Sequence, residues 1–361
     1  MTEALYIHIP FCDHICNYCD FPKLLLNYSN PSSYIDVLIA EIEGLNIKDD
    51  SLKTIYIGGG TPSSLSVEQL KKLLSYLKRR FNHLEEFTME ANPESLTAEK
   101  LSIMKSYGVS RLSLGVQSSF DTTLKKLGRK HTSKDVQECV KRIRDSGFTN
   151  LNLDFIYGLE GTSIQDLKRD IDFALSLKPQ HLSFYSLQIE PNTVFSSKKI
   201  SSLSDDELAD EYQFLCHELS RAGFNHYEVS NFALPSYESK HNLTYWHDEE
   251  YYACGLGASS YVDKVRRQNT LSMSRYMNRE FIASEEKISP KDEEFEFIML
   301  AFRLQEGISL KRYKERFHAD FKSKYHSSLI KEKDFLIIDD EHVAVKPDYF
   351  YIIDSIFLNL I

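Results

Sequence analysis

Three cysteines near the N-terminus have the spacing of metal ligands. Cys12, Cys16 and Cys19 are separated by three and by two residues, and they are half of the six cysteines in the chain. A loop this short can place three thiolates on one face of an inorganic cluster. Three thiolates leave one iron of a 4Fe–4S cluster without a protein ligand, and an open metal position is where a substrate or cofactor binds. The spacing therefore predicts a 4Fe–4S site.

Two other interpretations of these cysteines stay open. A structural zinc site would combine the three thiolates with His14, which lies between them in the chain. Alternatively, the cysteines would be small core residues. That ordinary role is the one we expect for the isolated Cys139, Cys216 and Cys254.

The first half of the chain alternates short apolar runs with amphipathic helices. Six strands are predicted, at residues 5–9, 53–57, 87–90, 111–114, 151–156 and 181–187. Such alternation indicates parallel βαβ units. Six strands are too few for a closed eight-stranded barrel, so we expect an α/β fold built as an open, partial (β/α)6 TIM-like barrel, with chemistry at the carboxyl ends of the strands. A doubly wound sheet fits the same periodicity.

The pattern changes after about residue 200. We expect residues 1–200 to form the barrel core and residues 201–289 to form an extension that links it to the rest. Residues 290–361 are predicted as a mainly helical C-terminal domain. Two short strand signals within it, at 335–338 and 342–345, predict a β-ribbon.

The cysteine motif, with Tyr18 directly before its last cysteine, resembles the signature of the radical S-adenosylmethionine (SAM) superfamily. Other segments resemble one branch of that superfamily, which contains the oxygen-independent coproporphyrinogen dehydrogenase HemN and the heme chaperone HemW. These segments are residues 6–12 (YIHIPFC), 58–63 (GGGTPS), 90–93 (EANP), 113–118 (SLGVQS), 129–131 (RKH) and 152–159 (NLDFIYGL). The resemblance extends to about Val262, and more weakly to the end.

The resemblance implies that SAM binds the open iron through its amino and carboxylate groups. One electron from the reduced cluster then cleaves SAM into methionine and a 5′-deoxyadenosyl radical, so an electron donor such as flavodoxin or ferredoxin is implied. The implied SAM contacts are Tyr6, Gly59, Gly60, Thr61, Glu90, Gln117, Arg129 and Asp154. Their chemistry agrees, because glycines let a ligand approach the backbone, carboxylates suit ribose hydroxyls or an ammonium, and an arginine suits a carboxylate. We expect packing or supporting hydrogen bonds from His8 and His131.

A second segment, His241, Asn242, Tyr245 and Trp246, resembles the HNxxYW motif on the HemW side of the branch. An imidazole beside two aromatic rings could ligate heme iron while the rings cover the porphyrin face. The structural alternative is that the rings pack a domain junction and that His241 makes a structural hydrogen bond. His247 follows directly and is a second candidate ligand.

Phe21 distinguishes the two functions within the branch. The dehydrogenase has a further cysteine at this position, two residues after the third, and an N-terminal extension that we do not expect here. The resemblance therefore implies a heme chaperone that binds heme, a 4Fe–4S cluster and SAM, and delivers heme to apo-proteins of the respiratory chain. One alternative is a coproporphyrinogen III oxidase (dehydrogenase) or another radical SAM porphyrin oxidoreductase. Another is a non-catalytic cluster or zinc protein that serves as an interaction platform. No residue is assigned a catalytic role.

The net charge and the hydropathy of the chain limit which classes of partner and which compartment we expect. The chain has 43 basic and 53 acidic residues, a net charge of −10, which argues against nucleic acid as a partner. No apolar run approaches the roughly 18 residues of a membrane-spanning helix, and no signal-peptide pattern is visible. We therefore expect a cytoplasmic protein. Peripheral membrane contact and a homodimer are left open.

Overall fold

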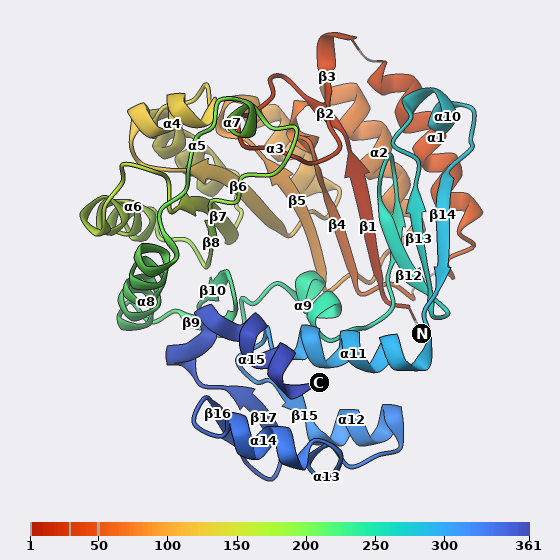
Figure 1. The fold of residues 1–361 in the computed structure, drawn as a ribbon. Helices are drawn as coiled ribbons and strands as arrows, with labels where there is room; N and C mark the ends of the chain where they lie inside the picture. The colour runs from red at the N-terminus through yellow and green to blue at the C-terminus, as the bar shows by residue number, and fades with distance from the viewer. Residues whose placement is uncertain (1, 29, 49–50) are drawn as a thin grey trace.

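The centre of the molecule is a nine-stranded sheet (Figure 1). The computed structural model describes residues 2–28, 30–48 and 51–361. The strand order is β11-β1-β4-β5-β6-β7-β8-β10-β9. Six of its parallel strands are β1 (Ala4–Ile9), β4 (Thr54–Gly59), β5 (Glu86–Ala91), β6 (Arg111–Gln117), β7 (Asn150–Tyr157) and β8 (His181–Ser186).

The order of these strands decides between the two expected architectures. The six strands lie side by side in chain order, whereas the strand order of a doubly wound sheet reverses at its middle. The two edge strands are β11 (Tyr252–Cys254), parallel to β1, and β9 (Asn225–Glu228), which reaches β8 through the antiparallel β10 (Asn231–Ala233). The sheet is therefore open, and the prediction of a partial barrel is confirmed.

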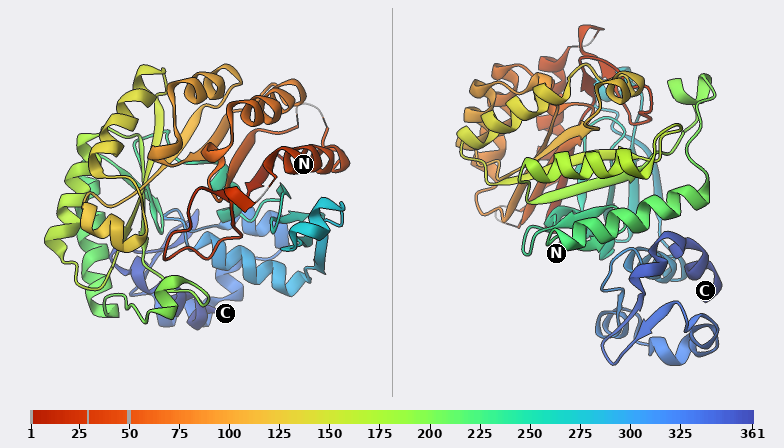
Figure 2. Two further views of the ribbon diagram at one scale, coloured as in Figure 1. Left: turned by 90° about the horizontal axis from the view of Figure 1, so that it is seen from above. Right: turned by 90° about the vertical axis from the view of Figure 1, so that its left-hand side faces the viewer.

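Helices cover the outer face of the sheet and form an arc when the molecule is seen from above (Figure 2). They are α1 (Pro31–Gly44), α2 (Val67–Arg80), α3 (Ala98–Ser106), α4 (Asp121–Leu127), α5 (Ser133–Asp145), α6 (Ile164–Ser176) and α8 (Asp205–Arg221). Capping boxes begin four of them, at Ser66, Thr132, Ser163 and Ser204. The main core lies between these helices and the apolar side chains on one face of the strands. The alternate positions of the strands carry polar side chains such as Thr54, Glu86, Arg111, Asn152 and His181.

A small antiparallel sheet packs beside β1. It consists of β12 (Ser259–Val262), β13 (Val265–Asn269) and β14 (Ile282–Lys287). The buried carboxylate of Glu41 in α1 accepts hydrogen bonds from Gly255 N at 2.9 Å, Asn269 Nδ2 at 2.6 Å and the Tyr276 hydroxyl at 2.5 Å. Burial raises the pKa of Glu41. This carboxylate therefore ties the small sheet to the barrel.

The C-terminal region has a core of its own and lies beyond the amino ends of the barrel strands (Figures 1 and 2). Its elements are α11 (Pro290–Ala301), β15 (Ile308–Ser309), α12 (Leu310–Phe317), α13 (Phe321–Lys324), α14 (His326–Glu332), β16 (Leu336–Ile338), β17 (His342–Val345) and α15 (Ile353–Leu360). The mainly helical character and the β-ribbon agree with the prediction, while the three domain boundaries stay predictions. None of the helices in the described part of the chain has the length and apolar character needed to cross a membrane.

Candidate functional site

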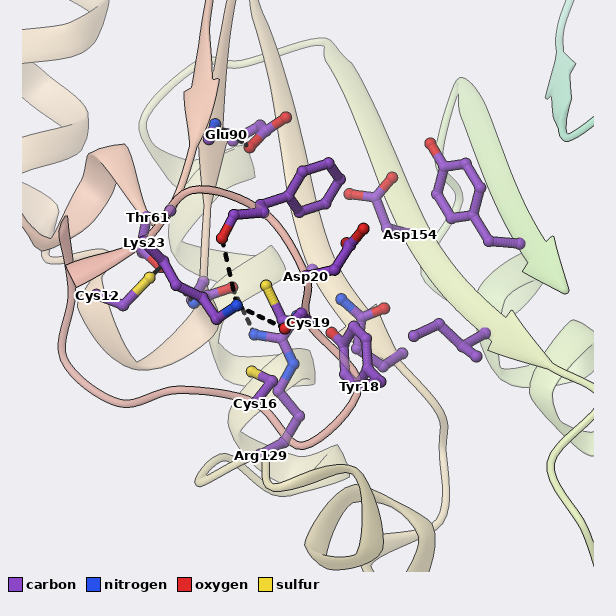
Figure 3. Close-up of a pocket in the computed structure, with 18 of the residues that line it drawn as sticks. Cys12, Cys16, Tyr18, Cys19, Asp20, Lys23, Thr61, Glu90, Arg129 and Asp154 are labelled. Carbon is purple, nitrogen blue, oxygen red and sulfur yellow. Dashed lines mark hydrogen bonds between the residues drawn. The ribbon is translucent and has the colours of Figure 1, made fainter. Parts of the chain in front are cut away.

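A cavity of about 560 Å³ opens at the carboxyl ends of the parallel strands. This is the end of a parallel barrel where ligands bind. The cluster loop, residues 12–23, forms one wall of the cavity (Figure 3). The ends of β4 to β8 form most of the rest, and Arg129, Gln188, Glu190 and Ser230 come from loops. The lining includes all three predicted cluster ligands and seven of the eight predicted SAM contacts, namely Cys12, Cys16, Cys19, Gly59, Gly60, Thr61, Glu90, Gln117, Arg129 and Asp154.

The three thiols lie on one loop and face one cavity. Burial raises the pKa of Cys12 to about 11, and the Thr61 hydroxyl lies 3.6 Å from the Cys12 sulfur. A Cβ atom at Gly60 would stand 2.8 Å from the backbone carbonyl carbon of Pro10 and 2.9 Å from both that sulfur and the Phe11 carbonyl oxygen, so a side chain there would displace Cys12 together with its backbone. Within the described ranges, no group of three His, Cys, Asp or Glu side chains lies close enough together to hold a metal ion. The donor set fits a three-thiolate cluster, and binding requires the loop to bring the sulfur atoms together.

Lys23, inside the cluster loop, and His8, in β1, make hydrogen bonds to backbone carbonyl groups of the loop. The Lys23 ammonium donates to the carbonyl oxygens of Cys19 at 2.5 Å and Phe21 at 3.2 Å (Figure 3). The His8 ring donates from Nε2 to the carbonyl oxygen of Pro22 at 2.8 Å. Burial lowers the pKa of His8. A neutral ring with its proton on Nε2 donates to Pro22 and leaves Nδ1 free to accept from the Tyr6 hydroxyl. The loop therefore has an internal cation next to its cysteines.

Four carboxylates line the cavity, and Glu90 and Asp154 are the two that belong to strands of the sheet; the others are Asp20 and Glu190. Glu90 accepts hydrogen bonds from the Tyr56 hydroxyl at 2.8 Å and from Gly59 N at 3.1 Å. Burial raises its pKa to about 7, against the effect of the Tyr56 hydrogen bond. Asp154 accepts from the Ser113 hydroxyl at 2.9 Å, and burial raises its pKa as well. Two buried carboxylates with raised pKa values favour a ligand that brings hydroxyls or a positive charge.

Arg129 supplies a cation to the cavity lining, next to Asn92. Its Nη1 donates to Asn92 Oδ1 at 2.9 Å, and Asn92 Nδ2 donates to the Thr61 hydroxyl at 3.1 Å. Its buried Nε finds no acceptor among the described residues. Gln117 ends β6 with a φ of +71°, a strained conformation for a residue other than glycine. An unpaired buried guanidinium donor beside a strained strand end fits an anionic group of a ligand.

Tyr6 and the two other histidines have supporting positions. Tyr6 is the one predicted SAM contact outside the cavity lining, and its hydroxyl lies 3.0 Å from His8 Nδ1. His131 contacts Glu94 at 3.2 Å and the carbonyl oxygen of Val116 at 3.1 Å, as expected of a residue that makes supporting hydrogen bonds. His14 lines the cavity, and its Nε2 is 3.8 Å from a Glu94 oxygen.

The HNxxYW segment lies at the opposite end of the sheet. It forms α9 (Lys240–Trp246), between the amino ends of β4 and β5 and the helix α11 (Figure 1). His241 is fully buried, and its ring nitrogens contact the Thr54 hydroxyl at 2.9 Å and the Tyr245 hydroxyl at 2.8 Å. Burial lowers its pKa to about 3. This geometry is that of the structural alternative. His247 is partly exposed and lies 2.9 Å from Glu306.

Several lining residues were not singled out from the sequence, including Lys23, Tyr56, Asn92, Ser113, Tyr185 and Gln188. Asn92 stands two residues after Glu90 in the EANP segment, which was a usable signal. Tyr185 is at the end of β8, where barrel ligands bind. Lys23 had no signal beyond its closeness to the cysteines.

Comparisons with known proteins place this fold and site. The family model described as the radical SAM superfamily matches residues 6–174, and that of the HemN C-terminal domain matches residues 288–348. The solved structure of coproporphyrinogen III oxidase (HemN) from Escherichia coli, described as a radical SAM enzyme, has a TM-score of 0.85 with 19% identity. It covers 99% of this chain and 90% of that chain, and at this identity it shows the fold alone. Fold and site define a radical SAM protein.

Sequence relatives narrow the class to one family. A heme chaperone HemW of Lactococcus lactis subsp. lactis (strain IL1403) is 41% identical, over 90% of this chain and 87% of the relative. The HemW of Bacillus subtilis (strain 168) is 40% identical, over 87% of each chain. The HemW of Escherichia coli (strain K12) is 36% identical, over 84% and 83%. The chain belongs to the HemW family.

Proposed function

We propose that this protein is a heme chaperone that binds heme, a 4Fe–4S cluster and SAM, and delivers heme to apo-proteins of the respiratory chain. The support for heme and for delivery comes from the relatives, which are named heme chaperones. The support for the cluster and SAM comes from the superfamily and from the cavity. We place its action in the cytoplasm, with a one-electron donor such as flavodoxin or ferredoxin.

In this proposal Cys12, Cys16 and Cys19 hold the cluster, whose bound state supplies one-electron chemistry to SAM. We assign Arg129, whose Nε has no partner among the described residues, to the SAM carboxylate. We assign Glu90 and Asp154, which line the same cavity, to its ribose hydroxyls or its ammonium. Phe21, 62% exposed at the cavity wall, takes the position where the dehydrogenase has a further cysteine.

The convergence of three thiols, two carboxylates and one arginine in a single cavity carries the cluster and SAM part of this proposal. The three thiols share one loop, whereas Glu90, Asp154 and Arg129 come from three other segments of the chain. Isolated polar residues of these types are often caps or structural hydrogen-bonding groups. Their meeting at the carboxyl ends of five strands is the arrangement of a ligand site.

For heme, the proposed contact region is the segment from His241 to His247, including Asn242, Tyr245 and Trp246. Within it we favour His247 as the axial ligand. His247 is partly exposed and only its Nε2 has a partner among the described residues, Glu306 at 2.9 Å. In the fully buried His241, both ring nitrogens are engaged, by Thr54 and Tyr245, so binding iron would cost one of these hydrogen bonds. The indole nitrogen of Trp246 is buried and has no hydrogen-bond partner among the described residues.

The test is anaerobic reconstitution with iron and sulfide, followed by separate titrations with heme and with coproporphyrinogen III. The proposal expects a heme Soret band that saturates, and no formation of protoporphyrinogen. Loss of one axial ligand shifts the Soret band, so His247→Ala should change it, with His318→Ala, on the exposed end of α12, as a matched control. Multiple turnovers of coproporphyrinogen would replace this proposal with the dehydrogenase.

A further inference from the structure

A column of aromatic rings connects α9 to the cluster loop through the inside of the barrel. The column consists of Tyr245, His241, Tyr56, Tyr6 and His8. Successive ring centroids are 5.2 Å, 5.3 Å, 6.1 Å and 6.0 Å apart. These are contact distances for aromatic pairs. The column therefore runs from the amino ends of the strands to their carboxyl ends, where the cavity lies.

Strand register explains why the rings meet. Tyr6 of β1 is the direct partner of Tyr56 of β4, and His8 is the partner of Gly58. Side chains two residues apart in a strand share a face, so Thr54 and Tyr56 point to the same side of β4. Thr54 thereby reaches His241 at one end of this face, while Tyr56 reaches Glu90 at the other.

The lower end of the column is fixed by buried polar contacts. The carboxylate of Glu86, the first residue of β5, accepts hydrogen bonds from the backbone N–H groups of Lys240 and His241, both at 3.1 Å. Acidic groups stabilise the N-terminus of a helix in this way. The His241 ring is then held by Thr54 and Tyr245. The position of the His241 ring against the Tyr56 ring is therefore fixed by contacts to β4, β5 and α9.

The upper end of the column reaches the ligand cavity by two routes. The Tyr56 hydroxyl donates to Glu90, whose carboxylate also accepts from Gly59 N. The Tyr6 hydroxyl contacts His8, which in turn donates to Pro22 in the cluster loop. One route thus ends on a proposed SAM contact, and the other ends on the loop that carries the cysteines.

Gly58 and Gly59 have no side chains, and this leaves room for the rings of the column. A Cβ atom at Gly58 would lie 2.8 Å from both Glu90 Oε1 and the Tyr56 ring, and one at Gly59 would lie 2.5 Å from the His8 ring. The absence of side chains at both positions therefore serves the column and not only the approach of a ligand. No local pattern in the sequence predicts this, because the rings come from β1, β4 and α9, which are far apart in the chain.

We propose that His241 is a positioning residue of the SAM pocket, which acts on Glu90 through the ring and hydroxyl of Tyr56. The proposal rests on the proposed SAM site. A truncated His241 would leave a cavity against the Tyr56 ring, and the ring would move toward it. The Tyr56 hydroxyl would then lose its alignment with Glu90, and the carboxylate would no longer be held where the ligand meets it. The HNxxYW segment thereby acquires a role at the opposite end of the barrel.

The test is a double-mutant cycle on SAM affinity, measured by calorimetry on the anaerobically reconstituted protein. We expect His241→Ala to weaken SAM binding about tenfold, and Tyr56→Phe to weaken it by a similar factor. Because both changes act through one hydrogen bond, the double variant should bind SAM about as weakly as Tyr56→Phe alone. His241→Phe restores a ring against Tyr56, so it should recover most of the affinity while it loses both hydrogen bonds.

His226→Ala is the matched control. His226 lies between Tyr212, at 3.1 Å, and Gln305, at 3.0 Å, outside the cavity lining. It should lower the midpoint of urea unfolding without changing SAM affinity. Multiplicative effects of His241→Ala and Tyr56→Phe would overturn the inference, as would a His241→Phe variant that binds SAM no better than His241→Ala. Wild-type protein that binds no SAM would overturn both this inference and the proposed SAM site.

Discussion

Replacing Gly59 with alanine tests how the aromatic column packs against the glycine turn, at a position that also lines the cavity. Gly59 has a φ of +114°, and its new Cβ atom would lie 2.5 Å from two atoms of the His8 ring. The ring cannot swing aside freely, because it is buried and held at both nitrogens by Tyr6 and Pro22. The backbone conformation alone costs about 1 kcal/mol, overpacking costs about 2 kcal/mol, and disturbing the His8 hydrogen bonds costs about 1 kcal/mol.

We therefore expect Gly59→Ala to lower the free energy of unfolding by about 4 kcal/mol, measured by urea titration. Gly161→Ala separates the two causes, because Gly161 has a φ of +83° with open space around its Cβ position. That control should lose only about 1 kcal/mol. Gly44→Ala, in open space at the end of α1, should gain a few tenths of a kcal/mol. Equal losses for Gly59→Ala and Gly161→Ala would refute the packing of His8 against this turn.

Four further outcomes follow from the site. Cys16→Ala should lose most of the thiolate-to-iron absorption after reconstitution, while Cys139→Ala should keep normal iron and sulfide content. Gly60→Val should lose both the cluster and SAM, because its side chain would displace the Cys12 sulfur; retention of the cluster by this variant would contradict that contact. Asp154→Ala should weaken SAM binding at least tenfold in calorimetry, with a smaller effect on unfolding. The pKa of Glu90 is raised to about 7 from 4.5. The free energy of unfolding should therefore fall as the pH rises from 4.5 to about 7, and then level off. Glu90→Gln should flatten this slope.

The cluster loop could be predicted from the sequence because its signal is local. Three cysteines within eight residues need no knowledge of the fold, and the polar residues after successive strands follow from parallel βαβ order. The six parallel strands were also predictable, since each is a short apolar run between helices with clear caps.

Features that depend on distant partners could not be predicted in this way. The three-residue strand β11 exists because Tyr252–Cys254 pairs with β1, more than 240 residues earlier. The HNxxYW segment gives little indication of its helix, since α9 has only seven residues and its place is set by Glu86. The contact between Tyr6 and Tyr56 follows from the register of two strands, which no local pattern specifies.

The most direct test of heme chaperone function is heme transfer. Reconstituted protein would be loaded with one equivalent of heme, mixed with an apo-cytochrome and followed by the Soret band of the acceptor. The account predicts transfer that proceeds faster than release of heme to a passive scavenger such as excess albumin. Transfer that is no faster than release to the scavenger would contradict delivery, and failure to bind heme at all would contradict the proposed function.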